Sequence, residues 1–346
     1  MNRRQNRVTL ADVAAEAGVS RTAVAKVLLG TGGDHVRVAE DTAAKVKAAA
    51  SKLNYHPNRA AQQLRGAQSR IIGVLMHTMN ATVMQNRLAA LENAAAAHGY
   101  RLLVAQTRHD TAALPEFVSD LQGYGIDGLL CLFDLTPDAR KDIKPVFRGL
   151  KNVIFHGSPL FDGAYCVRVD TVQAVGKIMA HLLATGRKRI GMELWNMDDM
   201  LMQLREDGYR AALSEAGREV NDELIWIAQS DNPNPSEKIL NQAIDFFVDR
   251  QKVDAIVASN DLWAVRFVQK LKARGLRVPE DVAVVGYDNL ELATVIDPPL
   301  TTIDQRHDEY AETVMRLMVD LIADTNIKKS DRTRVIEPDL VVRCSA

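Results

Sequence analysis

The feature that most constrains the fold is a regular alternation of short apolar runs with longer helical stretches, from Ile71 to Val285. Consecutive parallel strands need a crossover connection, and a helix is the usual one. Right-handed crossovers place such helices on both faces of a sheet. The pattern therefore predicts an α/β fold with parallel sheets. The strands are too many for one small sheet, so we expect two lobes, with the chain crossing between them near residues 157–170.

The expected strands and helices take turns along the chain. Most of the helices end at a glycine, which can enter a left-handed turn without steric cost. Strands are expected at 71–76, 102–105, 128–133, 153–155, 189–192, 224–228, 255–258 and 282–285. Helices are expected at 82–98, 114–122, 138–148, 171–185, 203–216, 236–250 and 261–274.

The charge is divided unevenly along the chain. Residues 1–70 contain 12 Lys or Arg and 5 Asp or Glu, whereas the remainder contains 31 basic and 39 acidic residues. The formal net charge of −1 therefore conceals about +7 on the first segment and −8 on the rest. A basic arm on an acidic body is typical of a protein that binds nucleic acid through the arm.

The first 57 residues predict a small helical unit. Thr9 and Asp12 have the spacing of a capping box, and Gly18 ends the first helix. Ser20 can cap a second helix over residues 21–28, and a third helix is expected at 40–53. Two short helices joined in this way form a helix-turn-helix pattern.

The second helix has an apolar and a polar side. Ala23, Val24 and Val27 fall on one side, and Arg21, Thr22, Ala25 and Lys26 fall on the other. Arg and Lys donate to guanine edges in the major groove, and Thr meets several bases. The alternative is a solvated charged face on an ordinary helical hairpin, and this motif alone leaves both interpretations open.

Two motifs resemble the N-terminus of the LacI/GalR family of bacterial transcription regulators. Residues 8–20 read VTLADVAAEAGVS, residues 53–64 read LNYHPNRAAQQL, and IGV follows at 72–74. The resemblance extends over essentially the whole chain. It implies a small all-α helix-turn-helix domain, followed by a two-lobed α/β effector domain like the periplasmic sugar-binding proteins.

The resemblance also implies which residues contact DNA. Arg21, Thr22 and Lys26 match base-reading positions, and the stretch 58–66 matches a hinge helix that orders over the minor groove. From the residues alone this stretch is a conditional helix or a linker, too short to be stable by itself. Leu64 would wedge into the central base step, since an exposed leucine can offset unstacking; otherwise it would rest on the effector domain. The full set is Thr9, Leu10, Ser20, Arg21, Thr22, Lys26, Tyr55, Asn58, Arg59, Ala61 and Leu64.

The chain departs from the family pattern in the DNA-binding segment. Lys26 stands where arginine is common, which replaces a bidentate fork by a point charge. Leu29 stands where asparagine is usual, and Ala39 replaces a capping serine. The loop 30–35 is about four residues longer than is typical of the family, which puts its phosphate contacts in doubt.

The effector residues are also carried over from the resemblance, which is strongest at 258–261, 275–288 and 298–303. It implies ligand contacts from Arg205, Asn260 and Asp288, with His307 as a lining residue. Asn260 and Asp288 follow apolar strands, where open parallel sheets bind ligands. The alternative is that each of these residues stabilises a turn at the end of a strand or forms a surface ion pair. Asp170 resembles the acidic residue that opens the second lobe, or it caps a helix.

The domain boundaries expected from these motifs are 1–57 for DNA binding, 58–69 for the hinge and 70–346 for the effector domain. The first lobe is expected at about 70–168 and 302–326, and the second lobe at about 169–301 and 327–346.

Other classes of protein fit less well. The three cysteines match neither a disulfide framework nor a zinc site, and no segment resembles a signal peptide or a membrane span, so a cytoplasmic protein is expected. Nucleotide-binding and nucleophile motifs are absent from the sequence, and no metal or cofactor is expected. A solute-binding protein for uptake is the main alternative, and a sugar-metabolising enzyme is a weaker one.

We therefore expect a homodimer that binds double-stranded operator DNA at an inverted repeat and responds to a small effector, a sugar or a sugar derivative. A repressor is favoured, although activation would follow from another operator position. The effector would either release DNA or promote its binding. His307 stands where sugar-responsive members carry an aromatic residue, which disfavours an unmodified hexose.

Replacement of Leu64 by alanine should weaken binding to the specific operator far more than binding to random DNA, because only the bent operator buries the leucine. Fluorescence anisotropy with both DNAs measures the two losses. Equal losses would contradict the minor-groove wedge.

Overall fold

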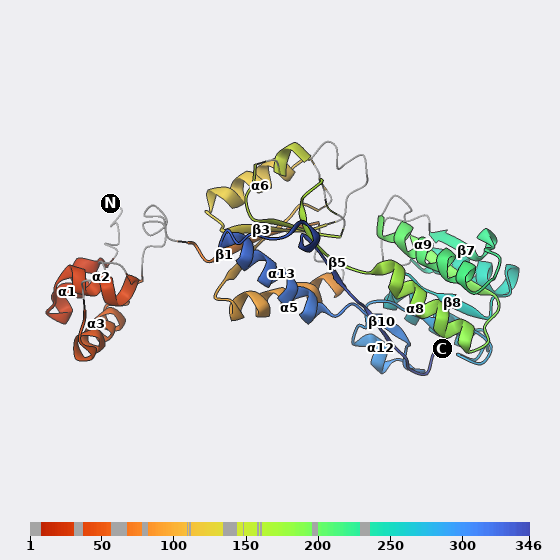
Figure 1. Cartoon of the computed structure of the whole chain (residues 1–346). Coiled ribbons are helices and arrows are strands. Elements are labelled where there is room, and N and C mark those ends of the chain that lie inside the picture. Colours follow the sequence, from red (N-terminus) through yellow and green to blue (C-terminus); the bar gives the residue numbers. More distant parts are fainter. Residues whose placement is uncertain are drawn as a thin grey trace. The chain divides into compact units, whose positions relative to one another are not determined.

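The chain divides into two compact units, Met1–Ser69 and Arg70–Ala346, and each is described by itself. A computed structural model, drawn in Figure 1, provides the coordinates. The described residues are 8–30, 37–56, 68–77, 82–108, 110, 112–133, 144–147, 149–157, 159, 161–195, 200–228 and 236–346. The expected loop at 30–35 beyond Gly30 and the hinge stretch 58–66 lie outside them.

The first unit is the expected three-helix domain. Its helices are α1 (Leu10–Ala17), α2 (Arg21–Leu29) and α3 (Glu40–Lys52). They pack around a small core that includes Val13, Val24 and Val46, each without solvent exposure. A core of this size makes the ends of the helices important for stability.

The caps of these helices follow the sequence pattern closely. The Thr9 amide donates to the Asp12 carboxylate at 2.8 Å, and the Asp12 amide donates to the Thr9 hydroxyl at 3.4 Å, which completes the capping box. Gly18 ends α1 in the left-handed conformation, with φ 65°. Ala39 begins α3 without a side-chain cap, as its replacement of serine predicts.

The first lobe of the second unit is built on a six-stranded parallel sheet in the order β11-β5-β4-β3-β1-β2. The strands run parallel, as helical crossovers require. For example, Ile71 of β1 pairs with Arg101 of β2, and Ile72 pairs with Gly128 of β3. The strands are β1 (Ile71–Met76), β2 (Arg101–Gln106), β3 (Gly128–Leu132), β4 (Val153–His156), β5 (Tyr165–Val169) and β11 (Thr333–Ile336).

Helices cover both faces of this sheet. On one face α5 (Thr82–Ala97) and α13 (His307–Ile322) lie side by side and contribute Leu91 and Val314 to a buried cluster (Figure 1). On the other face α6 (Leu114–Gly123) packs over a second cluster rich in phenylalanine. Most of the expected helix 138–148 lies outside the described residues, and residues 144–147 are helical.

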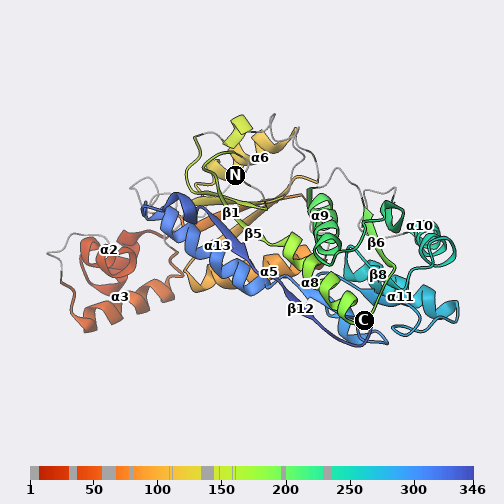
Figure 2. The same ribbon diagram turned by 45° about the vertical axis from the view of Figure 1, so that its right-hand side comes forward.

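The second lobe repeats this plan with a four-stranded parallel sheet in the order β7-β6-β8-β9. One buried cluster lies beneath α8 and α9, and another lies beneath α10 and α11. Figure 2 labels these four helices. The strands are β6 (Ile190–Trp195), β7 (Ile225–Ala228), β8 (Ala255–Val257) and β9 (Ala283–Val285). The helices are α8 (Thr171–Ala184), α9 (Met200–Glu215), α10 (Glu237–Ile244), which continues as a π-helix to Arg250, α11 (Asp261–Ala273) and the short α12 (Leu292–Val295).

The last part of the chain does not divide between the lobes as expected. The proposed second-lobe segment 327–346 contains β11, which pairs with β5 in the first sheet, so this assignment is wrong for residues 333–336. From Glu337 onward the segment reaches the second lobe, where Lys177 of α8 donates to the Glu337 carboxylate and the Val284 amide donates to the Ser345 carbonyl. A separate antiparallel pair, β10 (Thr302–Asp304) with β12 (Asp339–Val341), lies along the crossing.

The sequence pattern misses β5, since 157–170 is expected only as a crossing, and it also misses β10, β11 and β12. The five residues of β5 include Arg168, and the run therefore lacks the continuous apolar character of the other strands. The strand forms because it lies between β4 and β11 and pairs with both of them.

Gly208 sets the approach of α9 to α8. A Cβ at this position would lie 2.7 Å from the Val172 carbonyl oxygen and 2.9 Å from the Val175 Cβ. Replacement by alanine should therefore lower the free energy of unfolding by roughly 1–3 kcal/mol, the usual cost of overpacking. Urea unfolding measures this loss.

Gly176 in α8 provides the matched control, because a Cβ there would meet no atom within 4 Å. Its replacement by alanine should raise stability by about 0.5–1 kcal/mol through helix propensity. A Gly208→Ala variant as stable as the unchanged protein would contradict the close-packing account.

Candidate DNA-binding face and effector cleft

The expected recognition helix presents the predicted polar face. Arg21 and Thr22 are exposed on the first turn of α2, while Val24 is fully buried. Lys26 is half-buried one turn later. The first turn of a recognition helix is the part that reaches base edges in the major groove, so this arrangement is suited to reading DNA.

Other residues of the predicted DNA set have structural tasks in this unit. Thr9 and Ser20 cap α1 and α2, and the Ala23 amide donates to the Ser20 hydroxyl at 3.2 Å. Leu10 and Tyr55 are half-buried and pack against the core. These contacts fix the orientation of α2. The predicted hinge residues Asn58, Arg59, Ala61 and Leu64 lie outside the described residues.

Arg205 is a buried residue at the carboxyl edge of the second sheet. The sequence pattern predicted that Arg205 lies at the beginning of this helix. Helix α9 begins earlier, at Met200, so Arg205 lies inside it and shares a face with the buried Met202. The guanidinium carbon lies 3.8 Å from the centre of the Tyr287 ring. One terminal nitrogen donates to the Ser259 carbonyl, while Nε has no hydrogen-bond partner.

Glu193 is fully buried near the end of β6. Its Oε2 accepts a hydrogen bond from the Ser259 amide at 2.8 Å, whereas its Oε1 has no hydrogen-bond partner. Burial raises the pKa of this carboxyl to about 7, and hydrogen bonding by Ser259 and the charge of Arg205 only partly oppose the shift. Sequence reasoning missed Glu193, although a single acid within the apolar run IGMELW was a signal.

Asp288 follows β9 with φ 108°, a left-handed backbone conformation that asparagine and aspartate adopt more readily than most residues. It is buried, and its Oδ1 accepts a 2.6 Å hydrogen bond from the Gln305 side chain. Burial raises the pKa of Asp288 to about 6, and Arg205 opposes the rise. The carboxylate is thus held between the two lobes, and it has lone pairs for a ligand hydroxyl.

Asn260 caps α11, since its side-chain oxygen accepts the Trp263 amide at 2.9 Å. It is half-buried, and its cap places it at the carboxyl end of β8 as the sequence predicted. The alternative role of Asp170 as a cap is confirmed as well, because its carboxylate accepts the Gln173 amide at 3.1 Å at the start of α8.

His307 begins α13, on the first-lobe side of the crossing. Both of its ring nitrogens are buried and have no hydrogen-bond partner. Burial, with the positive charge of Arg87, lowers the pKa of His307 to about 4. The ring is therefore neutral at physiological pH, with one donor and one acceptor nitrogen.

Arg87 is the largest residue of the cleft that sequence reasoning missed. It lies in α5 and is only 2% exposed. Its terminal nitrogens lie 2.9 Å from His156 Nε2 and 2.5 Å from Gln305 Oε1. The signal was a charged residue on the apolar side of a helix, in register with the buried Leu91 and Ala95.

Asp288 and His307 share a pocket of about 510 Å³ where α5, the loop after β9 and the start of α13 meet. Asn86 and Asp304 also line it, so both lobes contribute polar groups. Arg205 and Asn260 do not line this pocket. The structure thus brings two of the four predicted effector residues together directly and links Arg205 to Asp288 electrostatically.

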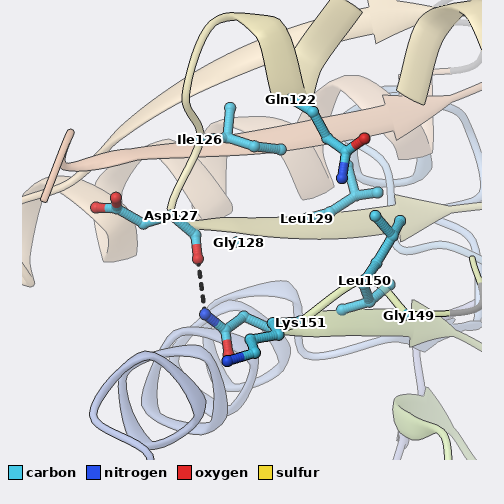
Figure 3. Close-up of a pocket in the computed structure, with 10 residues that line it drawn as sticks. Gln122, Ile126, Asp127, Gly128, Leu129, Gly149, Leu150 and Lys151 are labelled. Carbon is cyan, nitrogen blue, oxygen red and sulfur yellow. Dashed lines mark hydrogen bonds between the residues drawn. The ribbon is translucent and has the colours of Figure 1, made fainter. Parts of the chain in front are cut away.

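A second pocket, of about 420 Å³, lies at the amino ends of β3 and β4 (Figure 3). Its polar groups serve the lobe itself, since Asn152 Nδ2 donates to the Asp127 carbonyl at 2.9 Å, and the Asp127 carboxylate accepts the Arg70 amide at 2.8 Å. None of the predicted effector residues lines it. The pocket at Asp288 is therefore the better candidate for the effector.

The described part of the chain contains no group of three His, Cys, Asp or Glu side chains suited to a metal ion. It also contains no helix long and apolar enough to span a membrane.

The raised pKa of Glu193 predicts a pH-dependent effect of its replacement by glutamine. Between about pH 4.5 and 7 the folded protein keeps a proton on Glu193 that the unfolded chain has lost. The wild type therefore loses stability as the pH rises through this range. Glutamine does not titrate, so Glu193→Gln should gain stability relative to wild type between pH 5 and pH 8, by up to about 3 kcal/mol. Urea unfolding at both pH values measures the gain.

The exposed Glu215 of α9 provides a control, and its replacement by glutamine should show no such difference. A Glu193→Gln variant whose relative stability does not change with pH would contradict a buried, protonatable Glu193.

Comparisons with known proteins agree with this architecture. The family model described as bacterial regulatory proteins, lacI family, matches residues 9–58, and the periplasmic binding protein-like domain matches 179–346. The chain is 30% identical to the HTH-type transcriptional repressor PurR of Serratia proteamaculans (strain 568), over 97% of this chain and 96% of that one. It is also 30% identical to the ribose operon repressor of Escherichia coli (strain K12), over 98% and 99% of the two chains.

Solved structures show the same likeness. The lac repressor dimer bound to operator and the anti-inducer ONPF superposes with a TM-score of 0.84 at 25% identity, covering 98% of this chain and 99% of that one. The complex of the regulator CelR with cellobiose has a TM-score of 0.70 at 28% identity, covering 98% and 100%. The expected fold class, a helix-turn-helix domain followed by a two-lobed α/β domain, is confirmed. The chain belongs to the lacI family of bacterial regulatory proteins, and it is a DNA-binding transcription regulator.

Proposed function

We propose that this regulator is a dimeric repressor whose affinity for an inverted-repeat operator changes when a small polar effector binds at Arg205, Asn260, Asp288 and His307. The observation that carries the proposal is the placement of Asp288. It is a buried carboxylate at the end of a second-lobe strand, and it is bound to a residue of the crossing into the first lobe.

This placement supports a coupling between ligand and lobes. The hydrogen bond from Gln305 to Asp288 joins the loop after β9 to the segment between β10 and α13. A ligand hydroxyl bound at Asp288 would separate these two segments or bring them closer. A ligand changes a conformational equilibrium only by its unequal affinity for the two states. An effector that competes with Gln305 for Asp288 has such unequal affinity, because one of the two arrangements must lose a hydrogen bond.

The DNA-binding unit supports the other half of the proposal. Arg21 and Thr22 are exposed on the first turn of α2, and the caps at Thr9 and Ser20 hold α1 and α2 in place. We infer that Arg21 and Lys26 donate to base edges and that the predicted hinge residues contact the minor groove. Two such units on a dimer would read the two halves of an inverted repeat. Such a protein would act in the cytoplasm, and we assign it no enzymatic step.

The proposal predicts that Asp288→Asn uncouples ligand from DNA. We expect at least a tenfold loss of effector affinity, from the lost charge-assisted hydrogen bond, with operator affinity within about twofold of wild type. A thermal-shift screen of sugars, sugar acids, sugar phosphates and nucleosides identifies a ligand. Anisotropy with DNA from upstream of the gene then measures operator affinity with and without it.

The exposed Asp297 offers a matched control, and Asp297→Asn should respond like the wild type. An unchanged ligand response in Asp288→Asn would show that the effector binds elsewhere. An operator affinity that no bound ligand alters would contradict the repressor–effector coupling itself.

A further inference from the structure

Glu193 lies where the backbone pairing between β6 and β8 ends. The last paired residues are Met192 and Val257. The Ser259 amide, two residues further along the chain, donates to Glu193 Oε2 at 2.8 Å. Asn260, a predicted effector residue, follows directly and caps α11. The Glu193 carboxylate therefore holds the chain at the point where it leaves the sheet and enters the proposed effector site.

Ser259 connects this carboxylate to Arg205. Its carbonyl accepts a hydrogen bond from a terminal nitrogen of the Arg205 guanidinium, while its amide is held by Glu193. Glu193, Ser259 and Arg205 are 0%, 2% and 7% exposed, so water does not readily replace these bonds. A buried polar group that loses its partner is costly. The position of the guanidinium therefore depends on the same short segment that Glu193 fixes.

Arg205 carries a buried charge that requires a counter-charge. The ring stacked against it, that of Tyr287, is neutral, because burial raises the pKa of the Tyr287 hydroxyl. Two buried carboxylates respond to the charge of Arg205, those of Glu193 and Asp288. Asp288 already accepts a hydrogen bond from the Gln305 side chain, and it is the carboxylate that we propose the ligand to engage. Glu193 is thus the carboxylate that remains available to Arg205 when a ligand occupies Asp288.

The charge of Glu193 is variable near neutral pH. Burial favours the neutral acid, hydrogen bonding by Ser259 and the charge of Arg205 favour the carboxylate, and the resulting pKa is about 7. Oε1 has no hydrogen-bond partner, so it can carry a proton while Oε2 remains beside the Ser259 amide. Trp226, its neighbour on β7, and Ser259, which follows β8, do not titrate in this range, and the charged group that acts on Glu193 is Arg205 of α9.

We propose that Glu193 is a positioning residue of the effector site, whose carboxylate holds the Arg205 guanidinium in place through Ser259 and releases it on taking up a proton from water. This inference rests on the proposed effector role of Arg205 and adds a regulation of the same site by pH. An effector that requires Arg205 would therefore bind more weakly when Glu193 is protonated.

The Nε–H group of Arg205 reports this hold without any ligand. It is buried and has no hydrogen-bond partner, so it exchanges with water when the guanidinium leaves its place. NMR of the full-length protein, labelled with 15N at arginine Nε, measures its exchange rate relative to that of the exposed Arg101. Arg205→Lys and Arg101→Lys identify the two signals by their loss. From pH 6 to pH 8 the relative rate should fall about five- to tenfold, because the protonated fraction of a group with a pKa of about 7 falls about tenfold.

Variants assign this change to Glu193. Glu193→Gln keeps an oxygen acceptor for the Ser259 amide but has no charge, so its relative rate should be the same at both pH values and close to that of the wild type at pH 6. Glu215→Gln, at an exposed position of α9, serves as the control and should keep the full change. Asp288→Asn, which removes the other carboxylate that responds to Arg205, should keep a change of the same sign.

A second measurement starts from the other end of the link. The Glu193 carboxyl, labelled with 13C and identified by the loss of its signal in Glu193→Gln, should titrate in the wild type with a midpoint of about 7. Arg205→Gln removes the positive charge that lowers this pKa, so the midpoint should rise by roughly one pH unit. Arg210→Gln removes a charge that is paired with Glu206 on the surface, and it should leave the midpoint unchanged.

An Arg205 exchange rate that keeps the same ratio to that of Arg101 at pH 6 and pH 8 would overturn the inference. So would a ratio that changes as much in Glu193→Gln as in the wild type, or a Glu193 midpoint that does not move in Arg205→Gln. None of these measurements uses a ligand or operator DNA. An effector whose affinity is unaffected by Asp288→Asn would contradict the proposed function and leave these results as they are.

Discussion

The hydrogen bond between Gln305 and Asp288 is the interaction on which the account of the effector domain depends. Asp288 follows β9 of the second sheet, and Gln305 lies between β10 and α13, whose helix packs on the first sheet. Because both groups are buried, each would be left unsatisfied if the other moved away, which is costly inside a protein. The bond therefore favours one arrangement of the segments that join the lobes.

The buried polar groups around this bond form a continuous series. Arg87 binds Gln305 on one side, and His156 connects Arg87 to the Tyr310 hydroxyl, which lies 3.0 Å from His156 Nδ1. The series thus runs from the end of β9 to α13 and α5, the helix pair on one face of the first sheet. A ligand that competes for Gln305 would take a hydrogen-bond partner from both Asp288 and Arg87, so we expect its binding to affect the packing of α5 and α13.

The sequence predicted much of this fold because its signals are local. Capping by Thr9 and Ser20 and the helix end at Gly18 depend on neighbours a few residues away. Strand β5 and the placement of β11 in the first sheet were not predicted, because they depend on pairing between segments more than 160 residues apart. The charged Arg168 hides the strand in a local pattern, although the sheet provides partners on both sides.

The site shows the same division. Asp288 and Asn260 follow apolar strands, so their place at the carboxyl edge could be predicted, and Arg205 came from a motif. Arg87, Glu193 and Gln305 were missed, because a charge among apolar neighbours is only a weak local signal for the first two and Gln305 has no such signal. Only the fold reveals that Arg87 and Gln305, 218 residues apart in the chain, share a hydrogen bond.

The central claim is that ligand binding and operator binding are coupled through this domain, and such coupling is reciprocal by thermodynamic necessity. The most direct measurement is the dissociation constant of an identified effector by calorimetry, with the full-length protein free and bound to operator DNA. The account predicts that operator changes the effector constant by the same factor as effector changes the operator constant, about 5- to 150-fold for typical coupling free energies. An effector constant that is the same with and without operator would contradict it.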